Sequence, residues 1–264
     1  MDSLTQQPHS ERHLHAAARM ALLHGFLGST RAWDGLRAHL VDRAPVETIS
    51  LRGHAGTVEP AIESFEAELR RLIEARGQRP WPKTLVGYSL GARVALGLAA
   101  RVNVPFERLV LVSGRDGLLD ADEARARREL DDALAATLRS EGLAAFVDRW
   151  QALPLFESQR SLPEEIRSAH RARRLAHDPE GVARALSELS LGRMPRFGAT
   201  AVARTARVEL VVGARDAKFR RLAEDLVREH AAVRAIRLHV VPDAGHDVVL
   251  ERPAALAAIL EERS

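Results

Sequence analysis

Residues 85–96 read LVGYSLGARVAL and contain the pattern Gly-x-Ser-x-Gly, with Ser89 at its centre. The apolar residues around the start of this pattern predict a strand at 84–87, and the small apolar residues after it predict a helix at 92–100. Between a strand and a helix, two glycines allow close approach and leave the serine on a strained turn with its hydroxyl exposed. The stretch therefore predicts a nucleophilic serine, and the amide of Leu90 is placed to donate to a developing oxyanion.

Strand and helix patterns alternate on both sides of this stretch. Short apolar runs predict strands, and apolar residues at helical spacing predict the helices between them. The predicted strands lie at 20–23, 46–51, 84–87, 109–112, 208–212 and 238–241, and the predicted core helices lie at 31–40, 60–76, 92–100 and 253–262. Strands that alternate with helices indicate an α/β protein, in which a mostly parallel sheet is covered by helices on both faces.

Residues 118–196 differ from the rest of the chain. They show a charged, amphipathic helical pattern interrupted by prolines, and no convincing strand. We therefore expect an inserted helical cap at 118–196, lying as a lid over one edge of the sheet. Residues 1–117 and 197–264 are expected to form the core.

The composition argues against several classes of protein. Lys and Arg number 39 against 36 Asp and Glu, and the two signs are interleaved, which does not favour a nucleic-acid-binding surface. The absence of cysteine excludes disulfides, thiolate metal sites and a cysteine nucleophile, and favours a cytoplasmic location. No apolar run approaches the roughly 18 residues that would predict a membrane span. No H-E-x-x-H motif occurs, so we expect no metal site.

A catalytic serine needs a base, and the base needs an acid that orients it. Asp216 follows the strand predicted at 208–212, at the carboxyl edge where ligands collect in open α/β sheets. His246 follows the last predicted strand. The order Ser89, Asp216, His246 is that of the α/β-hydrolases, so these three residues are the predicted catalytic triad.

Other residues compete for two of these roles. Asp116 is the main rival for the acid, because it follows the preceding predicted strand. His24 and His54 lie in glycine-containing loops and are rivals for the base, but both come too early in the chain order. Asp243 and Asp247 flank the predicted base, and we expect both to be solvated.

Two further residues are candidates for the site. The sequence His-Gly-Phe after the first predicted strand places the amide of Phe26 as the second oxyanion donor, although a simple glycine turn is the alternative. Arg93 lies one helical turn after Ser89, on a helix that is otherwise apolar. An arginine in such a helix needs either a route to water or an anionic partner, and beside the nucleophile an anionic substrate is the natural partner.

Five stretches together carry a resemblance to a known family. They are LLHGFLGSTRAW (22–33), LVGYSLGARVAL (85–96), DRWQALPLF (148–156), VVGARDAKF (211–219) and AGHDVVLERP (244–253). These residues resemble the 2-succinyl-6-hydroxy-2,4-cyclohexadiene-1-carboxylate synthases of menaquinone biosynthesis, a branch of the α/β-hydrolase superfamily. The resemblance implies a cofactor-independent lyase that removes pyruvate from an enolpyruvyl-bearing cyclohexene carboxylate. It also implies that the triad serine abstracts a ring proton and that no acyl-enzyme forms.

The resemblance also implies residues that bind the substrate, a small polycarboxylate. Arg127 and Arg174 of the insertion would clamp carboxylates, but solvated arginines are common on amphipathic helices. Arg125 and Arg128 lie close to Arg127 in the sequence, and Arg173 is next to Arg174. Which arginine in each group binds a carboxylate therefore stays open.

Two aromatic residues belong to the same implied set. Tyr88, the only tyrosine, precedes the predicted nucleophile and could donate its hydroxyl into the pocket, with core packing as the alternative. Trp150 would line the pocket wall or simply pack the insertion against the core.

The chain departs from the family pattern at two places. The sequence before His24 is short and polar, so the first strands usual in this fold are expected to be reduced or missing. SLRGHAG at 50–56 replaces the more usual D-L-P-G-H-G. Neither departure touches a triad position.

One site architecture hosts many reactions, so the residues leave alternatives open. A serine esterase or a carbon–carbon bond hydrolase would use the same triad through an acyl-enzyme. A non-catalytic ligand-sensing protein on the same fold is the more remote alternative. The sequence does not determine the oligomeric state.

Overall fold

The computed structural model describes residues 18–41, 45–54, 62–102, 106–203, 205–230 and 235–262, and in them the chain forms a six-stranded sheet. The strands are β1 (Met20–Leu23), β2 (Val46–Ile49), β3 (Thr84–Tyr88), β4 (Arg108–Val112), β5 (Arg207–Gly213) and β6 (Ile236–Val241). They are ordered β2-β1-β3-β4-β5-β6, and every neighbouring pair is parallel. The predicted α/β fold class is confirmed.

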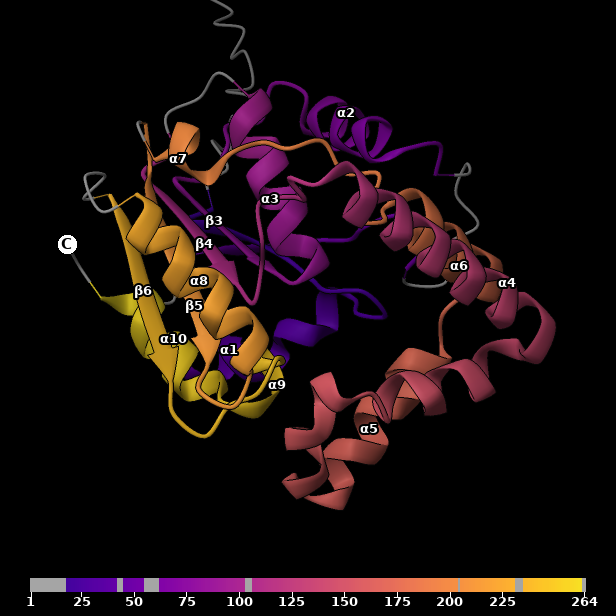
Figure 1. Ribbon diagram of the computed structural model, residues 1–264. Coiled ribbons are helices and arrows are strands. Elements are labelled where there is room, and N and C mark those ends of the chain that lie inside the picture. The colour runs from indigo at the N-terminus through magenta and orange to yellow at the C-terminus, as the bar shows by residue number, and fades with distance from the viewer. Residues whose placement is uncertain are drawn as a thin grey trace, which may run out of the picture.

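Helices cover both faces of this sheet (Figure 1). One face carries α2 (Phe65–Arg76), α3 (Leu90–Arg101), α7 (Ala199–Val202) and α8 (Ala217–Glu229), and the other carries η1 (Thr30–Trp33), α1 (Asp34–His39), α9 (Val248–Glu251) and α10 (Pro253–Glu261). Side chains alternate along each strand, so Leu85 and Leu109 pack under the first set of helices while Val86 and Val110 pack under the second. Burial on both faces explains why the inner strands β1, β3, β4 and β5 have largely apolar sequences, whereas the edge strands β2 and β6 are only partly buried.

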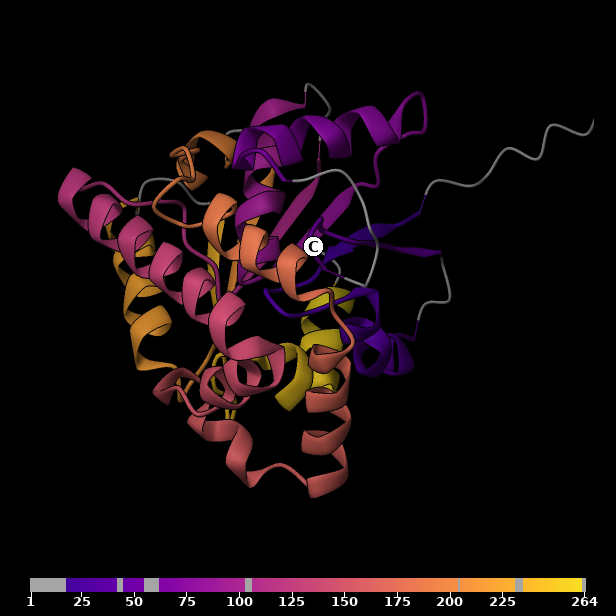
Figure 2. The same ribbon diagram turned by 90° about the vertical axis from the view of Figure 1, so that its right-hand side faces the viewer.

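Between β4 and β5 the chain leaves the sheet, and the four helical elements that precede α7 in this connection form what we call the cap. They are α4 (Ala121–Gln151), the 3₁₀ segment η2 (Pro154–Ser161), α5 (Glu164–Leu175) and α6 (Pro179–Glu188). Helices α4 and α6 run side by side, and Figure 2 views the molecule from the cap side, with the cap in front of the sheet. Leu138, Phe146 and Val182 form a separate apolar cluster here, which Leu27 of the core joins.

Helix boundaries differ from the predictions where capping decides them. Helix α2 begins at Phe65 rather than near residue 60, because the Ser64 hydroxyl accepts a hydrogen bond from the Ala67 amide at 3.1 Å. Helix α8 was not predicted, because its sequence is largely charged and Ala223 is its only fully buried residue. Within the described residues, no helix is both long and apolar enough to cross a membrane.

The first strands usual in this fold were expected to be reduced or missing. Residues 1–17 lie outside the described part of the chain, and within that part β1 is the first strand.

Candidate active site

Ser89 lies on a strained turn between β3 and α3. Its φ of +51° and ψ of −106° place a non-glycine residue in the left-handed half of backbone space. Both flanking glycines are required, because a Cβ on Gly87 would lie 2.2 Å from the Gly91 carbonyl oxygen and one on Gly91 would lie 2.1 Å from that of Leu23. The close packing of β3, α3 and β1 thus holds the serine in this conformation.

The predicted triad residues form a chain of hydrogen bonds. His246 Nδ1 donates to Asp216 Oδ2 at 2.7 Å, and His246 Nε2 lies 3.1 Å from Ser89 Oγ. Because the carboxylate can only accept, the Nδ1 atom carries the proton and Nε2 is left to accept the serine hydroxyl proton. Asp216 and His246 are both buried. The geometry is that of a nucleophile, a base and an orienting acid.

The competing residues lie elsewhere. Asp116 does not line the cavity that contains Ser89. His24 and His54 are fully buried, and burial lowers the pKa of His24 to about 4 and that of His54 well below its usual value. Each is bonded to backbone: the Leu51 amide donates to His24 Nε2, and His54 Nδ1 donates to the Arg52 carbonyl. Both histidines therefore hold loops together, and neither faces the cavity.

The loop that carries His246 is held from two sides. The hydroxyl of Ser113, at the end of β4, donates to the His246 carbonyl at 2.7 Å. The buried carboxylate of Glu251 accepts from the Gly245 amide at 2.8 Å and from the hydroxyl of Ser158, a cap residue, at 3.0 Å. Sequence reasoning missed all three contacts, because each joins residues that are distant in the chain or ordinary in type.

A cavity of about 520 Å³ lies between the carboxyl ends of the strands and the cap. Every predicted site residue lines it: Phe26, Tyr88, Ser89, Leu90, Arg93, Arg127, Trp150, Arg174, Asp216 and His246. Its volume is in the usual range for sites of small organic ligands. The structure thus brings together residues from both predicted parts of the chain.

Aromatic rings form one wall of the cavity. The Phe26 ring meets Trp150 edge-on, with centroids 5.0 Å apart, and Trp150 stacks on Phe146. Tyr88 lies beside His246, with ring centroids 5.7 Å apart. Burial raises the pKa of Tyr88 well above its usual value, so its phenol stays protonated and can donate a hydrogen bond.

Arg174 is a buried cation in this cavity. It is 3% exposed, its guanidinium lies 5.4 Å from the centroid of the Phe156 ring, and its Nε and Nη1 atoms have no hydrogen-bond partner. Burial lowers the pKa of this guanidinium. Buried donors that lack acceptors are costly in free energy, and a bound carboxylate would satisfy them. The neighbouring Arg173 also lines the cavity.

Arg93 and Arg127 also line the cavity, and they lie near one another. Arg93 Nη1 donates to the Leu189 carbonyl at 2.8 Å. Burial, aided by the nearby Arg127 charge, lowers the pKa of Arg93 to about 9, which leaves it charged at neutral pH. Arg127 Nε donates to the buried carboxylate of Asp131 at 2.9 Å.

The alternatives to Arg127 point away from the cavity. Arg125 pairs with Asp122 on the exposed side of α4, and Arg128 donates to the Gly192 carbonyl at 2.9 Å. Neither lines the cavity, whereas three cations that were not predicted, Arg115, Arg215 and Lys218, do so.

The expectation for Asp247 was wrong. Asp243 is exposed and pairs with Arg215 at 2.8 Å, but Asp247 is 5% exposed and lines the cavity next to the predicted base, His246. Its Oδ1 atom accepts from the Leu250 amide at the start of α9, which turns the side chain inward. Burial raises the pKa of Asp247 to about 6, against the opposing effect of the Arg174 charge.

We expect Asp247→Asn to stabilise the protein at neutral pH. A carboxyl whose pKa rises on folding from 3.8 to about 6 stabilises the folded state while protonated, and this contribution is lost as pH rises through about 6. Asparagine stays neutral and still caps α9. The free energy of unfolding in urea should therefore exceed that of wild type by up to about 3 kcal/mol at pH 7.5, and the difference should shrink at pH 5. An equal difference at both pH values would contradict this assignment.

Comparisons with known proteins agree with this geometry. The family model described as "Alpha/beta hydrolase family" matches residues 20–259. The 2-succinyl-6-hydroxy-2,4-cyclohexadiene-1-carboxylate synthase of Escherichia fergusonii is 33% identical over 262 residues, which cover 94% of this chain and 98% of the relative. Protein PHYLLO, chloroplastic, of Arabidopsis thaliana is 32% identical over 258 residues, which cover 91% of this chain but only 15% of that protein.

A solved structure agrees along nearly the whole chain. MenH from S. aureus superposes with a TM-score of 0.82 at 28% sequence identity, covering 93% of both chains. The chain therefore belongs to the α/β hydrolases and, within them, to the family of 2-succinyl-6-hydroxy-2,4-cyclohexadiene-1-carboxylate synthases.

Proposed function

We propose that this protein is a carbon–oxygen lyase of menaquinone biosynthesis. It eliminates pyruvate from 2-succinyl-5-enolpyruvyl-6-hydroxy-3-cyclohexene-1-carboxylate and forms 2-succinyl-6-hydroxy-2,4-cyclohexadiene-1-carboxylate. The observation that carries the proposal is the buried guanidinium of Arg174, which has unpaired donors in the same cavity as Ser89. Such a group favours an anionic substrate over a neutral ester.

The reaction begins with removal of a proton from the ring carbon that bears the succinyl group. His246 accepts the Ser89 hydroxyl proton, and the serine oxygen takes the ring proton as the carbon–hydrogen bond breaks. Asp216 holds the imidazole in the required tautomer and stabilises its positive charge. The electrons of the carbon–hydrogen bond form a double bond to the next ring carbon, the existing ring double bond shifts by one position, and the carbon–oxygen bond to the enolpyruvyl group breaks. The leaving group departs as the enolate of pyruvate and takes up one proton, which balances the proton that His246 received and returns the triad to its starting state.

Negative charge collects on the succinyl carbonyl oxygen during proton removal. The amides of Phe26 and Leu90 are the proposed donors to that oxygen. The reaction includes no oxidation and no group transfer to the enzyme, so it requires no cofactor and no acyl-enzyme. A cofactor-independent reaction and a cytoplasmic location are parts of the same proposal.

The substrate carries three carboxylates, and the cavity offers cations for them. Arg174 is in the cap helix α5, Arg127 is in α4, and Arg93 is one turn from Ser89 in α3. The aromatic wall of Phe26 and Trp150 offers an apolar surface to the ring. This arrangement supports a small polycarboxylate as the ligand.

The test is pyruvate release from the enolpyruvyl substrate by the purified protein. We expect pyruvate and the cyclohexadiene product in equal amounts. The triad geometry would also suit a serine esterase or a carbon–carbon bond hydrolase. Rapid hydrolysis of neutral p-nitrophenyl esters without pyruvate formation would favour that alternative and overturn the proposal.

A further inference from the structure

A tight turn at residues 51–54 contacts the loop that carries Phe26. The His54 amide donates to the Leu51 carbonyl at 3.3 Å, and Gly53, the third residue of the turn, has a φ of +77°. These are features of a type II turn, in which proline is favoured at the second position. Arg52 is at that position in this chain, where the family pattern D-L-P-G-H-G has proline.

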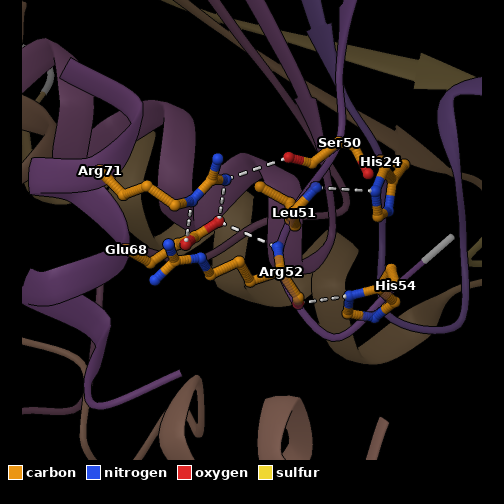
Figure 3. Close-up of polar contacts among 7 residues, drawn as sticks. All are labelled: His24, Ser50, Leu51, Arg52, His54, Glu68 and Arg71. Atoms are coloured by element: carbon orange, nitrogen blue, oxygen red, sulfur yellow. Dashed lines mark hydrogen bonds and ion pairs between the residues drawn. The ribbon is translucent and has the colours of Figure 1, made fainter. Parts of the chain in front are cut away.

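This turn holds the Phe26 loop by two contacts, and Figure 3 shows the first of them, the hydrogen bond between Leu51 and His24. The Leu51 amide donates to His24 Nε2 at 3.1 Å, which leaves the His24 Nδ1 proton to bond the Gly25 carbonyl at 2.8 Å. The His54 ring packs edge-on against both His24 and Phe26, with centroids 5.1 and 5.6 Å away. A displacement of the turn would therefore displace the residues that precede and include Phe26.

An ion pair between Glu68 and Arg71 on α2 is hydrogen-bonded to the backbone of this turn and of the residue before it. Glu68, which is 1% exposed, accepts from the Arg52 amide through Oε1 at 3.0 Å. Arg71 donates to both Glu68 oxygens at 2.6 and 2.8 Å and to the Ser50 carbonyl at 3.2 Å. Figure 3 shows these bonds on either side of Leu51, next to the amide that donates to His24. The pair thus fixes the segment on which the His24 contact depends.

We propose that Glu68 is a positioning residue for catalysis, which acts through the Arg52 amide, the 51–54 turn and His24 to place the Phe26 amide. Proline has no N–H, so the bond to Glu68 exists only because residue 52 is not proline. The buried carboxylate supplies here the rigidity that a proline ring would supply. The kinetic part of this inference rests on the proposed function, because Phe26 is the proposed oxyanion donor.

The first test compares Glu68→Gln with Glu66→Gln. In the wild type Glu68 Oε1 accepts from both the Arg52 amide and Arg71 Nη2, and Oε2 accepts from Arg71 Nε. Glutamine replaces one of these oxygens with an NH₂ donor, so at least one of the three bonds is lost and the grip on the turn loosens. Glu66 is on the same helix and pairs instead with Arg101 of α3, which makes it the matched control. We expect Glu68→Gln to lower kcat about tenfold with KM within about twofold, because small displacements of catalytic groups are costly. The control should behave as wild type, and equal losses in the two variants would overturn the proposal.

A rescue experiment separates positioning from general stability. Arg52→Pro fits the second position of the turn and restores its rigidity without the N–H. We expect Arg52→Pro to keep kcat within about threefold of wild type, and Glu68→Gln to cost less than about threefold in that background. Additive losses in the double variant would show that Glu68 does not act through this turn.

A substrate-independent readout keeps the two proposals distinguishable. By NMR, wild-type His24 should be the neutral Nδ1–H tautomer, and the Leu51 and Arg52 amides should exchange slowly. Glu68→Gln should speed both exchanges, while Glu66→Gln should not. If wild type releases no pyruvate, the proposed function fails but these amides still test the network. If the two amides exchange faster in Glu68→Gln while its kcat stays at the wild-type value, Glu68 is not a positioning residue for catalysis.

Discussion

We expect Ser89→Ala to lower kcat for pyruvate release by about 10⁴-fold, because alanine has no oxygen to take the ring proton. A water molecule could take the place of the serine oxygen as proton acceptor, but the strained turn would not hold it in line with the ring proton. Because the arginines proposed to bind the carboxylates are untouched, the affinity for the substrate should stay within a few-fold of wild type. Steady-state pyruvate release gives kcat, and titration calorimetry of the slow variant gives the affinity directly.

Ser140→Ala is a suitable control for this change. Ser140 is exposed on the cap helix α4 and bonds only the Thr137 carbonyl, so the variant should turn over as wild type does. Wild-type turnover by Ser89→Ala would disprove serine-based chemistry. A loss of affinity as large as the loss of kcat would indicate that Ser89 binds the substrate rather than reacting with it.

The second large effect concerns Arg174. We expect Arg174→Met to raise KM about 10- to 100-fold, because a charge-assisted hydrogen bond to a carboxylate contributes about 1.5–3 kcal/mol. Methionine retains much of the apolar stem and the contact with the Phe156 ring while removing the donors. The value of kcat at saturation should change far less than KM. Initial rates of pyruvate release over a range of substrate concentrations separate the two parameters.

The same helix offers the matched control. Arg171 of α5 is exposed and pairs with Asp148 at 2.7 Å, so Arg171→Met should leave KM near that of wild type. Removing the buried Arg174 guanidinium, whose Nε and Nη1 lack partners, should leave the thermal unfolding midpoint unchanged or higher. A lower midpoint together with an unchanged KM would mean that Arg174 stabilises the fold and does not bind the substrate.

The parts of the fold that follow from local pattern were predictable. The inner strands β1, β3, β4 and β5 were visible as largely apolar runs, because a parallel strand buried on both faces has few polar positions. The edge strands β2 and β6 are only partly buried and contain polar residues, yet both were predicted. Helix α8 escaped prediction because a helix on the sheet surface needs little apolar sequence: Ala223 is its only fully buried residue. The start of α2 depended on one serine hydroxyl, which a periodicity argument does not weigh.

The candidate site divides in the same way. Ser89, Asp216 and His246 could be placed because the ends of parallel strands meet at one edge of the sheet. The choice between Arg127 and Arg125 depended on which side of α4 faces the core, which the surrounding fold decides. Burial of Asp247 depended on a cap bond to Leu250 and on a cavity formed by distant segments. Such burial is a tertiary property that no short stretch of sequence records.

The connection between β4 and β5 has a consequence for how this protein could be altered. The two strands are hydrogen-bonded neighbours, so the cap leaves and re-enters the sheet between adjacent strands. An excursion whose ends already lie together can change length at small entropic cost, about 0.6 kcal/mol for each doubling. Replacing the whole connection between Val112 and Arg207, which comprises the cap and α7, with that of a relative should therefore exchange the specificity of the protein as a unit while the proposed proton-transfer residues stay in the recipient. The connection between β4 and β5 is thus the place where a segment of this chain can be exchanged with that of a relative.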